Sequence, residues 1–353
     1  MSYFFISMFL LIFVIMKKKA IWIYILLSVL VVLTIASVIG FNYAYEPYNG
    51  DSQWIKIDSN SDEISLRDSL KVRLGNEFGN KVYLMWSFFG GNTNNSVGAY
   101  KIDSGMTAVD ISKKIVRNYQ TPVKVVFNNI RTFEQLSERI SAKMMFSEQE
   151  FNEACDSVLS NEGLVKEEYV SVFFPDSYEF YWTSSATSFV QKMLGYYQKF
   201  WNEDRINKAK GMGLTPVEVS TLASIVEEET NKADERPLVA RLYLNRIKKG
   251  MKLQADPTVK FAIGDFSLRR ITHKHLTITS PYNTYMYEGL PPGPIRIVSK
   301  KTVDAVLNAP KHDYIYMCAK EDFSGYHNFA SDYASHLSNA KRYQTELNRR
   351  KIK

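Results

Sequence analysis

The sequence contains few of the residues from which metal centres and disulfide frameworks are built. Its 353 residues include two cysteines, Cys155 and Cys318, which lie far apart and lack the spacing of metal ligands. We therefore expect both to be buried free thiols. His273 and His275 form an H-x-H pair, but no acidic or cysteine partner follows at a recognisable spacing. We expect no metal ion and no other cofactor.

Nucleic-acid recognition motifs are also missing. The formal net charge of +7 would suit nucleic acid, anionic lipid or an acidic polymer, but the basic residues are spread along the chain. We find no helix-turn-helix, zinc-finger or RNP-like signature, so nucleic acid is not an expected partner. A hydrophobic fraction of 45% excludes a disordered chain and is enough for one large domain or two smaller ones.

The N-terminus carries a long hydrophobic run. Three lysines precede an uncharged segment from Ala20 to Tyr45, which exceeds the roughly 20 residues needed to cross a bilayer. The pattern predicts a transmembrane helix over 20–45 in the cytoplasmic membrane, with the lysines cytoplasmic and the rest of the chain extracytoplasmic. A cleaved signal peptide is the alternative, although the run is longer than a usual h-region and has no clean A-x-A site.

Residues 1–16 are apolar but short for a span. The stretch "MKKKAIW" from Met16 resembles an ordinary membrane-protein start, so we interpret 1–19 as a short cytoplasmic segment whose true start is Met16. A short hydrophobic hairpin is the alternative if translation begins at Met1.

Two segments after the span repeat each other. In "YKIDSGMTAVDISKKIV" and "VVFNNIRTFEQLSERIS", Thr107 matches Thr132 and Asp110 matches Gln135. Each copy predicts a strand, a turn and a helix that begins with a capping box. Such units serve either as binding modules for extended polymers or as structural spacers.

A poorer third copy begins at "IKIDSNSDEISLRDSL", where Ser65 and Asp68 take the same places. We predict a membrane-proximal module over 46–123. From 124 to 353, helical stretches alternate with aromatic-rich loops and no continuous parallel-strand pattern occurs, which indicates a mixed α+β domain.

The segment "TPVEVSTLASIVEEETNKADERP" predicts a helix that ends in three consecutive glutamates. Thr215, Pro216 and Glu218 form a capping box with proline at the first helical position, so the helix register is defined. Val219, Leu222, Ala223 and Val226 then form one apolar stripe.

The three glutamates leave this helix in different directions, because adjacent residues differ by about 100 degrees. Glu229 points to the apolar side, Glu227 to its edge, and Glu228 to the opposite face, where we expect solvent. Desolvation raises the pKa of a carboxyl, as a general acid requires. The alternatives are that the helix frays before Glu229, or that Glu229 forms a buried salt bridge with Arg236 or Arg241.

Polar residues interrupt apolar patterns further along the chain. Asn245 breaks the stripe of the next helix and needs a partner if it is buried. The turn that holds Gln254 and Asp256 is expected to line the same cavity as Glu229. In "SPYNTYMYEGLPPGPI", aromatic rings mixed with amides and hydroxyls are typical of a sugar-binding surface, with core packing as the alternative.

Four motifs carry a resemblance to a known family. They are "LASIVEEET", "ADERPLVARLYLNRIKKGMKLQADPTV", "SPYNTYMYEGLPPGPI" and "YIYMCAKEDFSGYHNFASDYASH", in consistent order. In these motifs the chain resembles the YceG-like endolytic murein transglycosylases. The resemblance implies a single-pass inner-membrane lyase with a LysM-like module and an α+β catalytic domain. Its implied reaction cuts the MurNAc–GlcNAc β-1,4 bond within peptidoglycan strands and leaves a 1,6-anhydro-MurNAc end.

The resemblance also implies site residues and partners. The family's catalytic glutamate, the second in its E-x-E-T pattern, corresponds to Glu229. Glu227 and Asn245 are expected to support it, Asn245 by holding either Glu229 or a neighbouring loop. The residues expected to line the glycan groove are Gln254, Asp256, Thr258, Tyr282, Asn283 and Tyr285. Peptidoglycan synthases are candidate partners.

Two other functions fit the same residues. One is a hydrolytic muramidase that uses Glu229 with Glu227 or Asp256, since ordinary glycosidases need two carboxylates. The other is a cell-wall-binding scaffold without catalysis.

Overall fold

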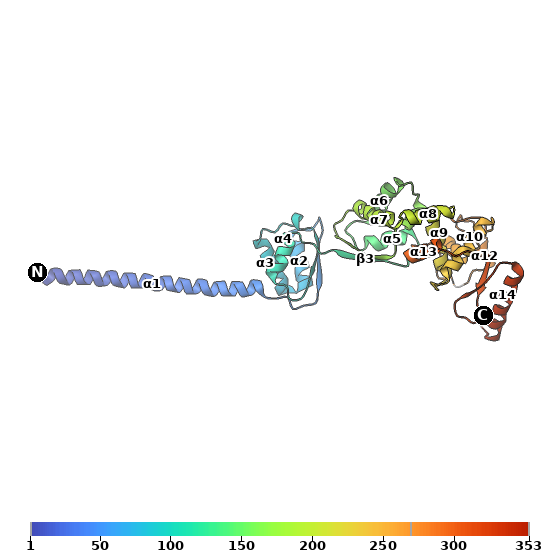
Figure 1. Cartoon of the computed structure of the whole chain (residues 1–353). Coiled ribbons are helices and arrows are strands. Elements are labelled where there is room, and N and C mark those ends of the chain that lie inside the picture. The colour runs from blue at the N-terminus through green and yellow to red at the C-terminus, as the bar shows by residue number, and fades with distance from the viewer. Residues whose placement is uncertain (1, 269, 352–353) are drawn as a thin grey trace. The chain divides into compact units, whose positions relative to one another are not determined.

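The N-terminal part of the chain is one long helix. A computed structural model describes residues 2–268 and 270–351, and its first helix, α1, runs from Ser2 to Tyr45 without a break (Figure 1). The segment Ile21–Tyr45 is long and apolar enough to cross a membrane, which is consistent with the span expected over 20–45. The hydrophobic hairpin considered above is wrong, because the helix continues through the lysines.

The chain divides into two compact units, Met1–Pro122 and Val123–Lys353. In the first, β1 (Gln53–Ile57) pairs antiparallel with β2 (Gly98–Ile102) in a two-stranded sheet. The helical elements of this unit after α1 are α2 (Glu63–Leu74), α3 (Asn76–Phe88), the 3-10 turn η1 (Asn94–Ser96) and α4 (Ala108–Val116). The inward side chains of the two strands and of these helices form one core, which includes Ile55, Leu70, Trp86, Ile102 and Ile111.

The repeated segments adopt the expected strand-turn-helix structure. In the first copy, Thr107 and Asp110 form both capping-box hydrogen bonds at the start of α4. In the second copy, Thr132 accepts a hydrogen bond from the Gln135 amide at the start of α5, at 3.2 Å. The Gln135 side chain turns instead to the amide of Arg131, at 3.0 Å. The prediction of a strand, a turn and a helix is confirmed for both copies, one in each compact unit, but the capping box is complete only in the first copy.

The register predicted for the third copy is wrong. The helix α2 is capped by Asp62, whose side chain accepts from the Ser65 amide at 2.8 Å. Ser65 therefore occupies the third helical position rather than the cap, and Asp68 lies a turn further on. Aspartate is as good a cap as serine, so the sequence offered two competing starts.

The second unit is mixed α+β, as the sequence predicts, and its sheets are two-stranded and antiparallel: β3 with β4 and β5 with β6. Its strands are β3 (Val123–Phe127), β4 (Asp176–Phe180), β5 (Tyr316–Ala319) and β6 (His327–Ala330). Its helices are α5 (Phe133–Ser141), α6 (Glu148–Ser160), η2 (Lys166–Val172), α7 (Ala186–Phe200), α8 (Glu203–Gly211), α9 (Pro216–Glu229), α10 (Arg236–Lys248), α11 (Asp256–Ile263), α12 (His273–Leu276), α13 (Lys300–Leu307) and α14 (Tyr333–Arg349).

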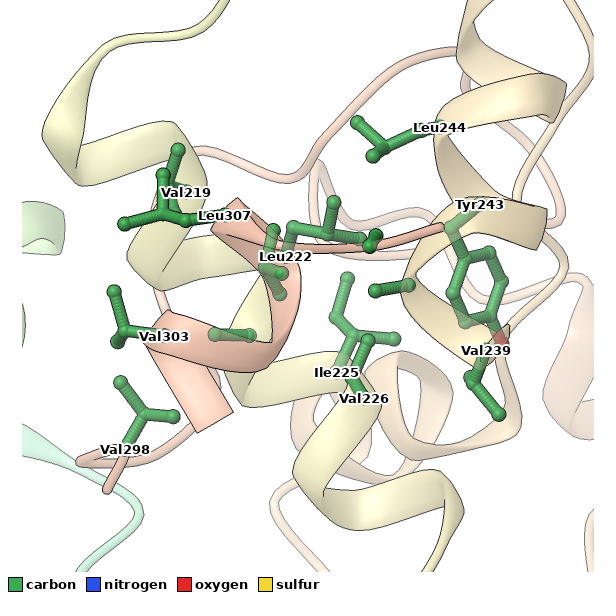
Figure 2. Close-up of a cluster of buried hydrophobic side chains, with 14 of the residues drawn as sticks. Val219, Leu222, Ile225, Val226, Val239, Tyr243, Leu244, Val298, Val303 and Leu307 are labelled. Carbon is green, nitrogen blue, oxygen red and sulfur yellow. The ribbon is translucent and has the colours of Figure 1, made fainter. Parts of the chain in front are cut away.

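Helix α9 runs through the core of this unit. Its start is as predicted: Glu218 accepts from the Thr215 amide at 2.7 Å, and Thr215 accepts from the Glu218 amide at 3.2 Å. The predicted apolar stripe is buried. Figure 2 shows the apolar side chains of α9 between Val303 and Leu307 of α13 and Val239 and Tyr243 of α10.

The burial of α9 goes beyond one stripe. Every residue from Val219 to Val226 is buried, including Ser220, Thr221 and Ser224, whose hydroxyls bond to carbonyls of their own helix. The helix therefore has no solvent face over most of its length. Its acidic C-terminal end begins inside the protein.

The turn "GLPPGPI" depends on a glycine. A Cβ on Gly293 would lie 2.0 Å from the carbonyl oxygen of Glu167 in η2, a distance that backbone does not tolerate. This close approach of two chain segments accounts for the glycine at that place in the motif. It also lets the chain after the turn reach α9, where the Ile295 amide donates to Ser224 at 3.0 Å.

Because the core is built around α9, we expect it to tolerate large-to-small changes poorly. The substitution Leu222→Ala, at a side chain with no exposed surface, should lower the free energy of unfolding by about 2–5 kcal/mol. Lys210→Ala, on the exposed side of α8, should change it by no more than about 0.5 kcal/mol. Chemical denaturation of both variants measures the difference, and equal stabilities would contradict the central place given to α9.

Candidate active site

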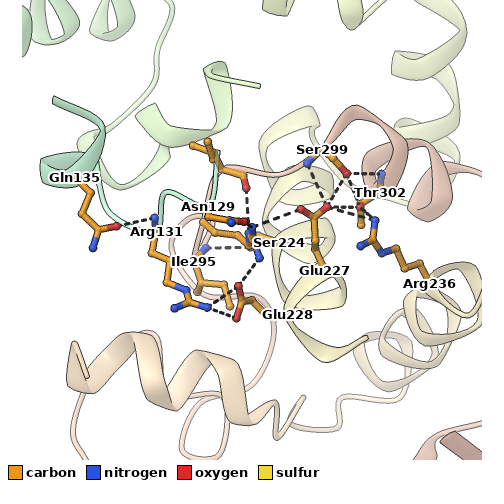
Figure 3. Close-up of polar contacts among 12 residues, drawn as sticks. Asn129, Arg131, Gln135, Ser224, Glu227, Glu228, Arg236, Ile295, Ser299 and Thr302 are labelled. Atoms are coloured by element: carbon orange, nitrogen blue, oxygen red, sulfur yellow. Dashed lines mark hydrogen bonds and ion pairs between the residues drawn. The ribbon is translucent and has the colours of Figure 1, made fainter. Parts of the chain in front are cut away.

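The three glutamates at the end of α9 meet three different environments. Glu227 accepts hydrogen bonds from the Ser299 amide at 3.2 Å and the Ser299 hydroxyl at 2.7 Å, and it is also bonded to Thr302. Figure 3 shows these contacts at the start of α13. Arg236 approaches the same carboxylate to 3.7 Å. Glu227 therefore fixes the N-terminus of α13 to α9.

Glu228 is not the solvated surface residue that the helical wheel predicts. Its side chain is 16% exposed and forms ion pairs with Arg131, at 2.8 Å, and with Arg296 (Figure 3). Arg296 also donates to Asn129 at 3.0 Å. The wheel assigned solvent to the face opposite the apolar stripe, whereas this end of α9 is covered on that face by two arginines from distant segments.

Glu229 is the last residue of α9, so the helix does not fray before it. Its Oε1 accepts a hydrogen bond from the hydroxyl of Tyr243 on α10, at 2.7 Å. The salt-bridge alternative is wrong. Arg236 donates to Thr302, and Arg241 donates to the carbonyls of Ala309 and Pro310.

A cavity of about 230 Å³ opens at Glu229. Of the expected groove residues, Gln254, Asp256 and Tyr285 line it. The Tyr285 hydroxyl donates to Asp256 at 2.6 Å, which holds the carboxylate against the start of α11. The other lining residues are Leu242, Tyr243, Arg246, Leu253, Met317, Cys318, Ala319 and His327.

Three expected groove residues instead stabilise the turns behind the cavity. Asn283 is fully buried and donates to the carbonyls of Leu276 and Ile278. Thr258 bonds to the Ala255 carbonyl and to Thr284. Tyr282 is half-buried, and its ring packs on Phe261 with centroids 4.6 Å apart. None of the three is among the described residues that line the cavity at Glu229. Their contacts fit the alternative of core packing, and their place in a glycan groove stays a prediction.

Asn245 holds a loop rather than Glu229. Its side-chain amide donates to the carbonyls of His312 and Tyr314, at 2.7 and 3.0 Å. This loop leads into β5, and β5 contributes Met317 and Ala319 to the cavity wall. Asn245 therefore fixes the loop that precedes a strand of the cavity wall.

Burial dominates the electrostatics of Glu229. Desolvation raises the pKa of its carboxyl to about 7, and the negative charge of Asp256 acts in the same direction. The hydrogen bond from Tyr243 and the positive charge of Lys260 act against this rise. The pKa of the Tyr243 phenol itself is raised well above its usual value by burial and by Glu229, so this hydroxyl remains a donor. A carboxyl poised near neutral pH can both give and take a proton.

Sequence reasoning missed several residues of the cavity. Tyr243 carried a signal, because it lies one helical turn after Val239 on the buried side of α10, and a buried phenol needs a partner. Arg246 carried no such signal in the sequence. It is buried and donates to the carbonyls of Leu253 and Ile315. Cys318 was expected to be buried, but it is partly exposed and lines the cavity; like Cys155 it is a free thiol.

The fold and the site together define a mixed α+β protein in which a carboxyl of raised pKa, that of Glu229, lies at an open polar cavity, an arrangement suited to general acid–base chemistry. The model of the YceG-like family matches residues 65–342, so the chain belongs to the YceG-like family. The resemblance drawn from the four motifs is confirmed.

Relatives agree with this assignment. The chain is 34% identical over 163 residues to the endolytic murein transglycosylase of Bacillus subtilis strain 168, a match that covers 45% of this chain and 44% of the relative. It is 31% identical over 150 residues to the protein of the same name from Streptococcus pneumoniae serotype 2, covering 41% of this chain and 27% of the relative. The chain thus spans less than half the length of the curated relatives it matches.

A solved structure shares the fold. The crystal structure of a yceG-like protein from Listeria monocytogenes aligns with a TM-score of 0.54 at 24% identity. The alignment covers 82% of this chain and 98% of that one. At this identity the likeness supports the fold alone.

The contacts of Glu229 predict that two conservative substitutions shift the pKa of its carboxyl in opposite directions. Tyr243→Phe should raise the pKa of Glu229 above about 7, because the lost hydrogen bond favoured the carboxylate. Asp256→Asn should lower this pKa, because it removes a neighbouring negative charge. Titration of the Glu229 carboxyl carbon by NMR measures both shifts, and a shift of the same sign in the two variants would contradict this electrostatic account.

Proposed function

We propose that this protein is a membrane-anchored endolytic lytic transglycosylase that cuts the MurNAc–GlcNAc β-1,4 bond within peptidoglycan strands. The observation that carries the proposal is the Glu229 carboxyl, with its pKa raised to about 7 at an open cavity. Membership of the YceG-like family and the names of its relatives support the same substrate. The reaction would leave a 1,6-anhydro-MurNAc end.

One carboxyl is enough for this reaction. Glu229 protonates the glycosidic oxygen as the bond from that oxygen to C1 of MurNAc breaks, and the bonding electrons leave with the oxygen. The C6 hydroxyl of the same MurNAc then attacks C1, and the Glu229 carboxylate takes the hydroxyl proton. Glu229 thus regains the proton that it gave to the leaving oxygen, and no water takes part in the reaction.

A hydrolytic muramidase is the second candidate, and Asp256 is the observation that favours it. Asp256 lines the same cavity as Glu229, so a second carboxylate is present. Glu227, by contrast, is held by Ser299, Thr302 and nearby arginines and is not among the cavity-lining residues. We therefore propose that Glu227 supports the site by fixing the position of α13.

We also propose that α1 anchors the protein in the cytoplasmic membrane. The lysines of α1 would then lie in the cytoplasm, and the second unit of the chain would lie outside the membrane. The apolar segment Ile21–Tyr45 and the lysines before it support this orientation. The expected glycan binding by the first unit and the expected peptidoglycan synthase partners stay predictions.

The substitution Glu229→Gln tests the proposal. It keeps the shape of the side chain but removes the transferable proton, so release of anhydro-muropeptides from peptidoglycan should fall by at least about 100-fold. Glu203→Gln, at an exposed position on α8, makes the same chemical change away from the cavity and should keep full activity. Circular dichroism establishes that both variants fold. Full activity in Glu229→Gln would overturn the mechanism.

Mass spectrometry of the wild-type products separates the two enzymes. A transglycosylase yields the anhydro end, whereas a muramidase yields a reducing MurNAc that is heavier by one water, about 18 Da. We expect the anhydro product. A product made only of the heavier form would replace the proposed function with hydrolysis, and no product at all would favour the cell-wall-binding scaffold.

A further inference from the structure

A buried carboxylate holds a histidine beside Glu229. Glu235, just before α10, is 3% exposed. It accepts hydrogen bonds from the Thr230 hydroxyl at 2.8 Å, from the His327 backbone amide at 2.7 Å and from the His327 ring nitrogen Nδ1 at 2.8 Å. The mechanism derived above uses neither Glu235 nor His327. The bond from Thr230 holds the Glu235 carboxylate, and the two bonds from the backbone and the ring of His327 fix the position and the rotation of the imidazole ring.

The contact also selects the state of the ring. A carboxylate only accepts hydrogen bonds, so Nδ1 carries the proton, and Nε2 of the neutral ring is an acceptor. Within residues 2–268 and 270–351, no hydrogen bond from protein to Nε2 is present. A buried carboxylate that sets the tautomer of a histidine is a device that enzymes use to aim Nε2 at a substrate.

His327 lies where two cavities meet. The first is the cavity at Glu229, and the second, of about 480 Å³, lies towards Lys232, Phe323 and Tyr326. The residues that line both are Glu229, Ala319 and His327. A polymer chain that occupies both cavities would therefore pass Glu229 and His327 at the same point.

We propose that His327 is a substrate-binding residue whose Nε2 accepts a hydrogen bond from an O–H or N–H group of the sugar at the cleaved bond. Glu235 is the positioning residue that maintains the required tautomer. This inference rests on the proposed function and deepens it: Glu229 moves the proton, and His327 holds the sugar in the orientation that the transfer requires.

Four variants of the full chain test the inference, with soluble uncross-linked glycan strands as substrate. His327→Ala should lower kcat/KM for release of the anhydro product by about tenfold or more, because it removes the acceptor. His327→Gln, whose side-chain oxygen can replace Nε2, should recover most of the loss. Asn328→Ala is the matched control, since this neighbour on β6 bonds to Glu321 instead, and it should behave as wild type.

Glu235→Gln is the sharpest variant, because it changes one atom and not the shape. The amide would donate to Nδ1, so the proton of the neutral ring would move to Nε2 and the acceptor would become a donor. We expect the loss in kcat/KM to match that of His327→Ala. The ¹⁵N signals of the His327 ring should report the proton on Nδ1 in the wild type and on Nε2 in the variant.

The outcomes are distinguishable. If the tautomer changes in Glu235→Gln but kcat/KM does not, or if His327→Ala keeps full activity, the inference is wrong and the proposed function stands. If the wild type and Asn328→Ala release no anhydro product, the proposed function is overturned and the inference falls with it. A purely structural role for the pair would lower the stability of Glu235→Gln without moving the ring proton.

Discussion

The burial of an acidic helix end is the constraint on which the second unit depends. Helix α9 has no solvent face from Val219 to Val226, and three glutamates follow directly. A buried carboxylate without partners is strongly unfavourable, so each glutamate must be paired, hydrogen-bonded or protonated. Successive residues point about 100 degrees apart, which means that one partner cannot serve all three.

The partners come from segments that are remote in the chain. Arg131 precedes α5, Arg296 follows the "GLPPGPI" turn, and Ser299 and Thr302 belong to the start of α13. By neutralising Glu227 and Glu228, these groups fix the end of α9 to its surroundings. Glu229 is left with one neutral donor, Tyr243, and with a cavity. The paired carboxylates of Glu227 and Glu228 thus hold in place the carboxyl of Glu229, which has no charged partner.

Local patterns predicted what local interactions decide. The capping box at Thr215, the buried stripe of α9 and the direction of Glu229 follow from helix geometry, and the structure has all of them. The environment of Glu228 could not be derived in this way, because its two arginines are placed by tertiary packing and not by the register of α9.

The same limit applies to the residues expected to line the groove. Amide and hydroxyl side chains such as Asn283 and Thr258 have the chemistry of sugar ligands, but the same chemistry satisfies buried backbone groups in turns, and here it does so. His327 on β6 escaped attention because its partner, Glu235, lies just before α10, 92 residues earlier in the chain. The functional state of a histidine depends on the atom that faces Nδ1, and the sequence alone does not identify that atom.

The position of Glu229 as the last residue of α9 has a consequence for turnover. The carbonyl end of a helix carries a partial negative charge, so a carboxylate formed there is repelled by its own helix. Each time the carboxyl gives up its proton, the end of α9 becomes less favourable until a proton returns. The direction of the helix therefore favours the return of a proton to Glu229 after every cycle. The backbone of α9 provides this effect without any additional side chain.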